Sequence, residues 1–269
     1  MCGPQNLETM GRARRRFWDI CAGVSTTLGL GFTGTGDGIL MYHSVRERFG
    51  NPGHCRFTRA AFRRQLKRLT EVGTVVSLER LLTESAPDQK RFALTFDDGY
   101  DNFRSSALPE LRLFDAPATL FVVPGKVGGS WRQDGYNESV AMLSWSNLDE
   151  LATDPLVTIG NHSLTHANLP SLNEQAIRTE VNDAKDRLEA RLDIEVNTFC
   201  YPGGKYDQAV RRLVGEHHEW GVTVEPGLVT ADYDPLTLPR VNGAWPAARV
   251  GWELSDYGAW TRRTFAQHR

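Results

Sequence analysis

The stretch ALTFDDGYDNF, residues 93–103, runs apolar residues directly into two adjacent carboxylates, which are followed by glycine and tyrosine. Neighbouring carboxylates repel each other, so a strand that ends in Asp97 and Asp98 is typical of a site that holds a cation or moves a proton. The alternative is that Asp98 or Asp101 caps the following helix. Capping needs only one carboxylate, however. Consecutive side chains at an extended strand end point in different directions, so one can bind a metal while the other accepts a proton.

Around this stretch, short apolar runs alternate with helical patterns. Most of these runs are continuously apolar, as expected for parallel strands buried on both faces. Seven are strand candidates, at 38–45, 92–96, 118–123, 156–162, 197–202, 221–225 and 236–241. Repeated strand–helix units predict an α/β fold with a parallel sheet. About seven units can close into an irregular barrel, and an open doubly wound sheet is the alternative. In both folds, functional groups collect where strands end.

Three segments between the strands have helical periodicity. The first, 58–72, has Thr58 as its predicted N-cap. The second, 171–192, opens with Ser171 and Glu174 at the spacing of a capping box. The third, 206–220, precedes the strand expected at 221–225.

Composition limits the classes of function. The chain has 269 residues, 40% of them hydrophobic and 24% charged, which suits one large α/β domain or two small ones. A formal net charge of -2 gives no polyanion-binding footprint, so no nucleic-acid partner is expected. Four cysteines without a close-spaced pair predict neither a disulfide framework nor a cysteine metal site, and a reducing compartment is the default.

The N-terminal part, residues 1–36, is predicted to be an extension that precedes a catalytic domain at 37–269. It contains the basic cluster GRARRRF (11–17), which is either a solvated segment or a contact with an anionic membrane surface. The next residues, 17–32, are only loosely like a signal peptide, because Asp19 and several polar residues interrupt the apolar run. No other run approaches the length of a membrane span. We expect a cytoplasmic protein whose basic N-terminus could contact a membrane.

A pair of histidines follows another candidate strand. In GNHSLTH (160–166), His162 and His166 are four residues apart. Two imidazoles and one carboxylate make three protein ligands and leave positions open for water and substrate, as in hydrolytic zinc sites. The alternative is a capping histidine and a surface histidine, because such pairs are common by chance. The position after an apolar strand, in a chain with two aspartates at another strand end, favours the metal.

Three motifs thus follow one another in the chain: LTFDDGYDN (94–102), GNHSLTH (160–166) and FCYPGGKYD (199–207). In this order and at about these separations they resemble the NodB-type polysaccharide deacetylases, carbohydrate esterase family 4. The resemblance runs from about residue 38 to about 245. It implies a distorted (β/α) barrel and a hydrolase that uses a divalent metal, zinc above all, to remove N-acetyl groups from an amino sugar.

Two other functions stay open. One is hydrolysis of an O-acetyl ester or a different amide by the same fold. The other is a non-catalytic carbohydrate-binding relative, which the complete set of matching motif residues disfavours. The resemblance implies that Asp97 is the catalytic base and that Asp98, His162 and His166 bind the metal.

The third motif departs from the family pattern RxPYG, since Cys200 replaces the arginine and Gly203 replaces the tyrosine. The resemblance implies that Tyr201, Pro202 and Gly203 form an oxyanion and substrate-binding segment, in which the Gly203 N–H can still donate. The motif arginine normally orients the base. Arg240, in the segment LPRV, is our candidate substitute, and a surface arginine or a structural ion pair is the alternative.

The family's general acid, a histidine on a late strand, is not found, and His268 lies in a polar tail. A subgroup of this family is permuted, with this histidine in an N-terminal YH motif. The segment LMYHSV resembles that arrangement, so His43 is the expected general acid, with a hydrogen-bonded core histidine as the alternative. Trp145, and also Trp131 or Tyr136, could stack on sugar rings, although packing is the commoner role of any single aromatic residue.

Overall fold

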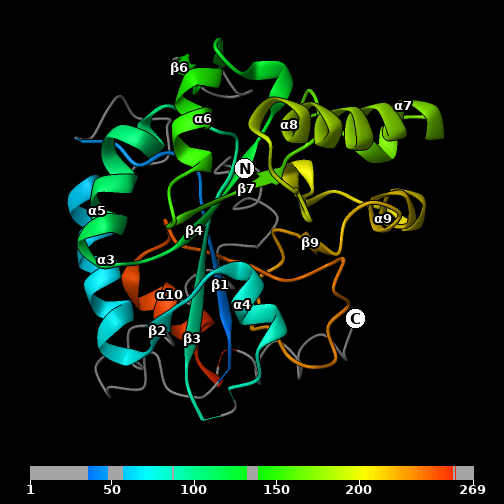
Figure 1. Cartoon of the computed structure of the whole chain (residues 1–269). Helices are drawn as coiled ribbons and strands as arrows, with labels where there is room; N and C mark the ends of the chain where they lie inside the picture. Colours follow the sequence, from blue (N-terminus) through cyan, green and yellow to red (C-terminus); the bar gives the residue numbers. More distant parts are fainter. Residues whose placement is uncertain (1–35, 48–56, 87, 132–138, 257, 259–269) are drawn as a thin grey trace.

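A curled parallel sheet surrounded by helices forms the protein (Figure 1). The computed structural model describes residues 36–47, 57–86, 88–131, 139–256 and 258. The main path of the sheet runs β10-β1-β3-β4-β7-β8-β9, and every pairing along it is parallel. Its strands are β1 (Gly38–Tyr42), β3 (Arg91–Phe96), β4 (Ala118–Val122), β7 (Val157–Asn161), β8 (Thr198–Cys200), β9 (Trp220–Val222) and β10 (Val241–Asn242). Six of the seven predicted strands are therefore confirmed, whereas the one predicted at 236–241 is displaced, since β10 shares only Val241 with it.

The two ends of this path approach each other beyond the regular ladders. Leu238, just before β10, makes an isolated parallel bridge with Val222 of β9. The Leu238 N–H donates to Gly221 O at 2.8 Å, and the Thr223 N–H donates to Leu238 O at 2.9 Å. The fold is thus the predicted distorted (β/α) barrel, closed here by one short contact. Short strands complete the described part: β2 (Thr74–Val75) pairs with β3, and β5 (Ser130–Trp131) pairs with β6 (Val140–Ala141).

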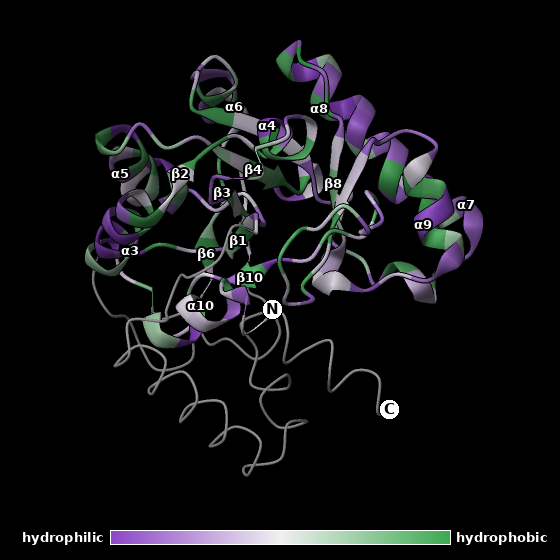
Figure 2. Cartoon of the chain, turned by 90° about the horizontal axis from the view of Figure 1, so that it is seen from below, coloured by the Kyte–Doolittle hydropathy of each residue, from purple (hydrophilic) through white to green (hydrophobic). Residues whose placement is uncertain are grey.

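Helices follow most of the strands and cover the outside of the sheet (Figure 1). They are α3 (Arg59–Val72), α4 (Leu78–Thr83), α5 (Leu108–Leu113), α6 (Trp145–Ala152), α7 (Glu174–Arg178), α8 (Ala184–Leu192), α9 (Gln208–Gly215) and α10 (Ala247–Glu253). Two π-helical turns, η1 (Phe103–Ala107) and η4 (Thr179–Asp183), and three 3-10 turns, η2 (Pro124–Lys126), η3 (Leu169–Ser171) and η5 (Pro202–Gly204), join them. Outer helices such as α8 and α9 alternate between hydrophilic and hydrophobic stretches along the ribbon, as expected for helices buried on one side (Figure 2).

The pleat of β3 determines which side chains enter the barrel. Phe92, Leu94 and Phe96 join the core cluster beneath the helices, whereas Ala93 belongs to the inner cluster. Successive strand residues face opposite sides, so the residues that follow Ala93 by two and by four positions continue its face. The carboxylate of Asp97, four positions after Ala93, is therefore directed toward the inside of the barrel at the carboxyl end of the strand.

Helix starts test two of the sequence expectations. Thr58 is the N-cap of α3, as predicted, and its side chain accepts a hydrogen bond from the Ala61 N–H. The capping box at Ser171 is wrong. Ser171 lies in η3, and the N-cap of α7 is Asn173, whose side chain accepts from the Ala176 N–H. Asparagine and serine cap about equally well, so the sequence spacing alone could not separate the two positions.

Some expectations concern residues outside the described ranges. They include nearly all of the predicted extension 1–36, together with Tyr136 and His268. Within the described part, none of the helices combines the length and the apolar character needed to cross a membrane.

Candidate active site

The two aspartates lie at the carboxyl end of β3, and both are buried. The Asp97 N–H donates to Tyr42 O, which extends the pairing with β1. Asp98 has a left-handed backbone (φ 79°) that turns the chain out of the strand. The next helical segment, η1, begins after Asn102 without a side-chain cap, so the alternative in which Asp98 or Asp101 caps a helix is wrong.

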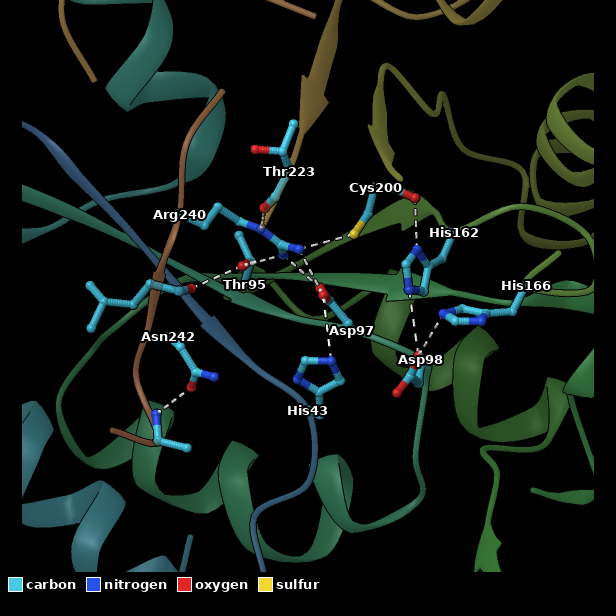
Figure 3. A network of polar contacts seen from close by, with 12 residues as sticks. His43, Thr95, Asp97, Asp98, His162, His166, Cys200, Thr223, Arg240 and Asn242 are labelled. Atoms are coloured by element: carbon cyan, nitrogen blue, oxygen red, sulfur yellow. Dashed lines mark hydrogen bonds and ion pairs between the residues drawn. The ribbon is translucent and has the colours of Figure 1, made fainter. Parts of the chain in front are cut away.

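Asp98, His162 and His166 converge on one point (Figure 3). The Nε2 atoms of His162 and His166 lie 3.4 and 3.7 Å from Asp98 Oδ1. Ligand atoms around a tetrahedral zinc ion, each about 2.0–2.1 Å from the metal, are about 3.3 Å apart. The three side chains therefore fit the metal that the sequence predicts, with two nitrogen donors and one oxygen donor. The His166 side chain is 16% exposed, which leaves one side of the cluster accessible.

The orientation of His162 is fixed from behind. Its Nδ1 atom lies 2.7 Å from the carbonyl oxygen of Cys200, which can only accept, so Nδ1 carries a proton and Nε2 is the nitrogen left to bind a metal. This arrangement is the usual one for metal-binding histidines. In the metal-free protein, burial disfavours the imidazolium of His162, but Cys200 and Asp98 raise its pKa well above the usual value. Burial, aided by His162, lowers the pKa of His166 to about 3.

A second group of three donors, Asp97, His162 and Cys200, is also close enough to share an ion. The guanidinium of Arg240 contacts both the carboxylate of Asp97 and the sulfur of Cys200. Because a permanent cation already occupies that side, the set that contains Asp98 is the better metal site.

Arg240 is completely buried and makes a bidentate pair with Asp97, at 2.7 and 2.8 Å. Its remaining donors bind Thr223 O, Thr95 Oγ1 and Cys200 Sγ. Burial by itself would raise the pKa of Asp97, but the charge and hydrogen bonds of Arg240 outweigh burial and hold that pKa well below its usual range. The surface alternative for Arg240 is wrong. Thr95, which the sequence analysis missed, lies two residues before Asp97 on the same face of β3.

His43 lies on the opposite side of Asp97 from Arg240 (Figure 3). Its Nε2 atom is 3.9 Å from Asp97 Oδ2, and its side chain is 8% exposed. Burial lowers the pKa of His43 to about 4, although Asp98 and Asp97 act in the opposite direction. The imidazole is therefore neutral at neutral pH in the metal-free protein.

The third motif places a backbone turn beside these groups. Gly203 has a left-handed backbone (φ 61°), a conformation that favours glycine. Within the described part of the chain, no acceptor binds the Gly203 N–H. Tyr201 and Pro202 are buried, and the Tyr201 ring packs against Phe199 and Tyr206. The Tyr201 ring therefore faces the core and cannot line a groove.

The candidate stacking residues differ in position. Trp145, the first residue of α6, packs against the core and lies beneath the guanidinium groups of Arg187 and Arg191, at 5.6 and 5.3 Å. Trp131, in β5, meets the ring of His166 edge-on, with the ring centroids 4.8 Å apart, and also contacts the Tyr100 ring and the Lys126 ammonium. The structure thus places Trp131, rather than Trp145, next to the metal-binding cluster.

Comparison with known proteins agrees with this arrangement. The family model described as polysaccharide deacetylase matches residues 84–219, half of the chain. The matched region contains both aspartates, both histidines of the cluster and the turn at Gly203, whereas His43 and Arg240 lie outside it.

Individual relatives extend the likeness over most of the chain. YxkH of Bacillus subtilis (strain 168), whose name assigns it provisionally to the polysaccharide deacetylases, is 27% identical over 82% of this chain and 75% of its own length. The poly-beta-1,6-N-acetyl-D-glucosamine N-deacetylase of Escherichia coli (strain K12) is 22% identical over 75% of this chain, which spans only 36% of that protein. The deacetylase PplD of Streptococcus pyogenes, solved in complex with acetate, is 26% identical and superposes with a TM-score of 0.67, covering 78% of this chain and 93% of PplD. The chain therefore belongs to the polysaccharide deacetylase family, whose members are hydrolases that act on the acetyl groups of carbohydrates.

Proposed function

We propose that this protein is a metal-dependent hydrolase that removes N-acetyl groups from an amino sugar in a glycan or a glycan precursor. The observation that carries the proposal is the convergence of Asp98, His162 and His166, with Asp97 beside them and bound to Arg240. A divalent ion held by the three ligands would polarise the amide carbonyl and make a neighbouring water more acidic. Two imidazoles and one carboxylate favour zinc among the common divalent ions.

The protein groups around that point have complementary tasks. Asp97 is kept ionised by Arg240 and is the base that removes a proton from the attacking water. The Gly203 N–H donates a hydrogen bond to the oxygen on which negative charge develops. Removing one such donor costs about 3–4 kcal/mol in other enzymes.

His43 is placed to complete the proton transfer. A neutral His43 has no proton to give at the start, but it lies 3.9 Å from the carboxylate that receives one from water. The proton can pass from Asp97 to His43 and then to the leaving nitrogen, which departs as a free amine while acetate forms. We infer that His43 acts as the general acid by passing on the proton that Asp97 has taken from water.

Two of the relatives support an acetyl substrate. The name of the Escherichia coli protein specifies an N-acetylglucosamine polymer, and PplD was solved with acetate. An O-acetyl ester is the second candidate substrate, because the same groups could act on an ester carbonyl.

The proposal is tested by measuring acetate release from a panel of N-acetylated glycans and matched O-acetylated glycans. We expect release from at least one N-acetylated glycan, loss of release after treatment with a chelator, and recovery when zinc is added back. Turnover that is unaffected when metal analysis shows less than one tenth of an ion per chain would contradict the metal requirement. Release from the O-acetylated glycans alone would replace the amidase proposal with the esterase.

The position of Trp131 predicts a selective effect on substrate binding. In the Trp131→Ala variant, we expect KM to rise about 3- to 10-fold with little change in kcat, because an aromatic ring beside His166 is lost from the substrate side of the cluster. Steady-state kinetics on the best glycan measure this. Trp145→Ala is the matched control and should leave KM unchanged, since the Trp145 ring packs against the core and the arginines of α8 rather than against His166. An increase in KM for the Trp145 variant alone would contradict the assignment.

A further inference from the structure

The loop that carries both metal-binding histidines has an unfavourable backbone. Ser163 and His166 adopt left-handed conformations, with φ of 60° and 67°. Non-glycine residues keep such conformations only where the surroundings hold them in place. Within the loop, the Ser163 N–H donates to Asn161 Oδ1, and the His166 N–H donates to Ser163 Oγ. These local bonds shape the turn but do not fix it to the rest of the protein.

The π-helical turn η4 supplies three external anchors of this loop, in addition to the bonds from the Gly125 N–H to Leu164 O and from the His162 N–H to Val122 O. The carbonyl oxygen of Glu180 accepts from the Leu164 N–H at 2.9 Å, and the carbonyl oxygen of Val181 accepts from Asn161 Nδ2 at 2.8 Å. The Glu180 carboxylate binds Thr165 twice: Oε2 accepts from the backbone N–H at 2.9 Å, and Oε1 accepts from Oγ1 at 2.6 Å. Asn161, Leu164 and Thr165 thus each donate a hydrogen bond directly to this turn.

The side-chain hydrogen bonds of the Glu180 carboxylate, in the described part of the chain, are made to the loop. Glu180 is only 8% exposed, and no lysine, arginine or histidine in the described part of the chain pairs with it. A buried carboxylate without a cation is costly unless it accepts good hydrogen bonds. Its side-chain bonds go to Thr165, the residue between Leu164 and His166. The widened turn that presents Glu180 interrupts one otherwise continuous helical segment from α7 to α8, and such turns are frequent at functional sites.

We propose that Glu180 is a positioning residue of the metal site. By holding Thr165, it fixes the turn from Ser163 to His166 so that the imidazole of His166 meets that of His162 at Asp98. The inference rests on the proposed function in that it takes Asp98, His162 and His166 as the metal ligands. Its consequence is that the affinity for zinc and the geometry of the bound ion depend on a side chain that touches neither the ion nor the substrate.

Metal binding tests the proposal independently of turnover. The dissociation constant for zinc is measured by competition with a chromophoric chelator, and the visible absorption of the cobalt(II)-substituted protein reports the ligand geometry. Glu180→Leu is expected to weaken zinc binding about 10- to 100-fold, as is typical when a group that supports a metal ligand is lost. It should also change the cobalt spectrum. Glu180→Gln, which can still accept from the Thr165 N–H, should recover much of the affinity.

A second variant removes one contact at an exposed position. Thr165→Val deletes the hydroxyl bond and keeps the side-chain shape, so zinc affinity should fall at least about threefold in a folded protein. The matched controls are Thr158→Val, at an exposed position of β7, and Glu174→Gln, at an exposed position of α7. Both should bind zinc as the wild type does.

Several outcomes would overturn the inference. If folded Glu180→Leu and Thr165→Val both bind zinc within twofold of the wild type, or if the controls lose as much affinity, Glu180 does not position the site. If the Glu180→Leu protein does not fold, the zinc affinity and the cobalt spectrum of Thr165→Val test the inference in its place. A wild-type protein that binds no zinc overturns this inference together with the metal site. Weakened zinc binding in the variants of a protein that releases no acetate supports the inference and overturns the proposed substrate.

Discussion

We expect Asp97→Asn to lower kcat for acetate release by about 10²- to 10⁴-fold and to leave zinc binding intact. This range is what a general base contributes in other enzymes, and the asparagine amide cannot accept a proton from water. The change preserves side-chain shape and can retain one hydrogen bond from Arg240, but it leaves that buried guanidinium without its counter-charge, so kcat is compared only after the variant is shown to be folded. Acetate release under saturating substrate and metal content per chain are the two measurements.

The neighbouring residue provides a matched control. Asp98→Asn makes the same chemical change one position later, but it removes the carboxylate that both imidazoles face. We expect this variant to lose zinc, whereas Asp97→Asn keeps it. Loss of zinc in both variants would show that Asp97 is a ligand. If kcat of the Asp97→Asn variant is within tenfold of the wild-type value, Asp97 is not the catalytic base.

We expect Arg240→Met to destabilise the metal-free protein by about 3–5 kcal/mol, because it leaves the buried carboxylate of Asp97 without its counter-charge. For a protein of this size, the corresponding fall in melting temperature is roughly 6–20 °C. Denaturation with urea at neutral pH measures the free energy of unfolding. Arg178→Met is the control: its ion pairs with Glu174 and Glu216 are at the surface, so its removal should have a much smaller effect.

The effect of Arg240→Met depends on pH. In the wild type, the folded-state pKa of Asp97 is depressed, so the stability contributed by the pair is present above the ordinary aspartate value near 3.9 and is lost as the pH falls below it. In the variant, burial still opposes ionisation but the main cause that lowers the pKa of Asp97 is gone, so we expect this pKa to be higher than in the wild type. The difference in unfolding free energy between the two proteins should therefore be largest at neutral pH and narrow toward about pH 3. A difference that is constant with pH would show that Asp97 is not the partner that Arg240 stabilises.

Local patterns in the sequence were enough to predict much of the fold. Continuous apolar runs predict buried parallel strands, and the strand ends bring residues 97, 98, 162 and 166 to the same edge of the sheet. The cap at Thr58 could also be predicted, because a single good N-cap precedes the helix. At the start of α7, by contrast, Ser171 and Asn173 compete, and only packing of the surrounding turn selects the asparagine.

Contacts between distant residues were harder to predict. Cys200 occupies the position of the motif arginine, and the guanidinium that fills the space comes from Arg240, 40 residues later in the chain. The sequence suggested Arg240 only because it lies at a late strand end. Nothing in the local pattern distinguishes Trp131 from Trp145, since their roles depend on the hairpin β5–β6 and on arginines of α8. Likewise, helical periodicity does not reveal the π-helical turn that presents Glu180.

The central claim is that Asp98, His162 and His166 hold one metal ion and that Asp97 stays outside its coordination shell. The most direct measurement is anomalous scattering at the zinc edge from crystals of the zinc-loaded protein. We expect a single peak within about 2.0–2.2 Å of Asp98 and of the Nε2 atoms of both histidines, with Asp97 still bound to Arg240. A peak on Asp97, His162 and Cys200, or no peak at either set, would contradict the account.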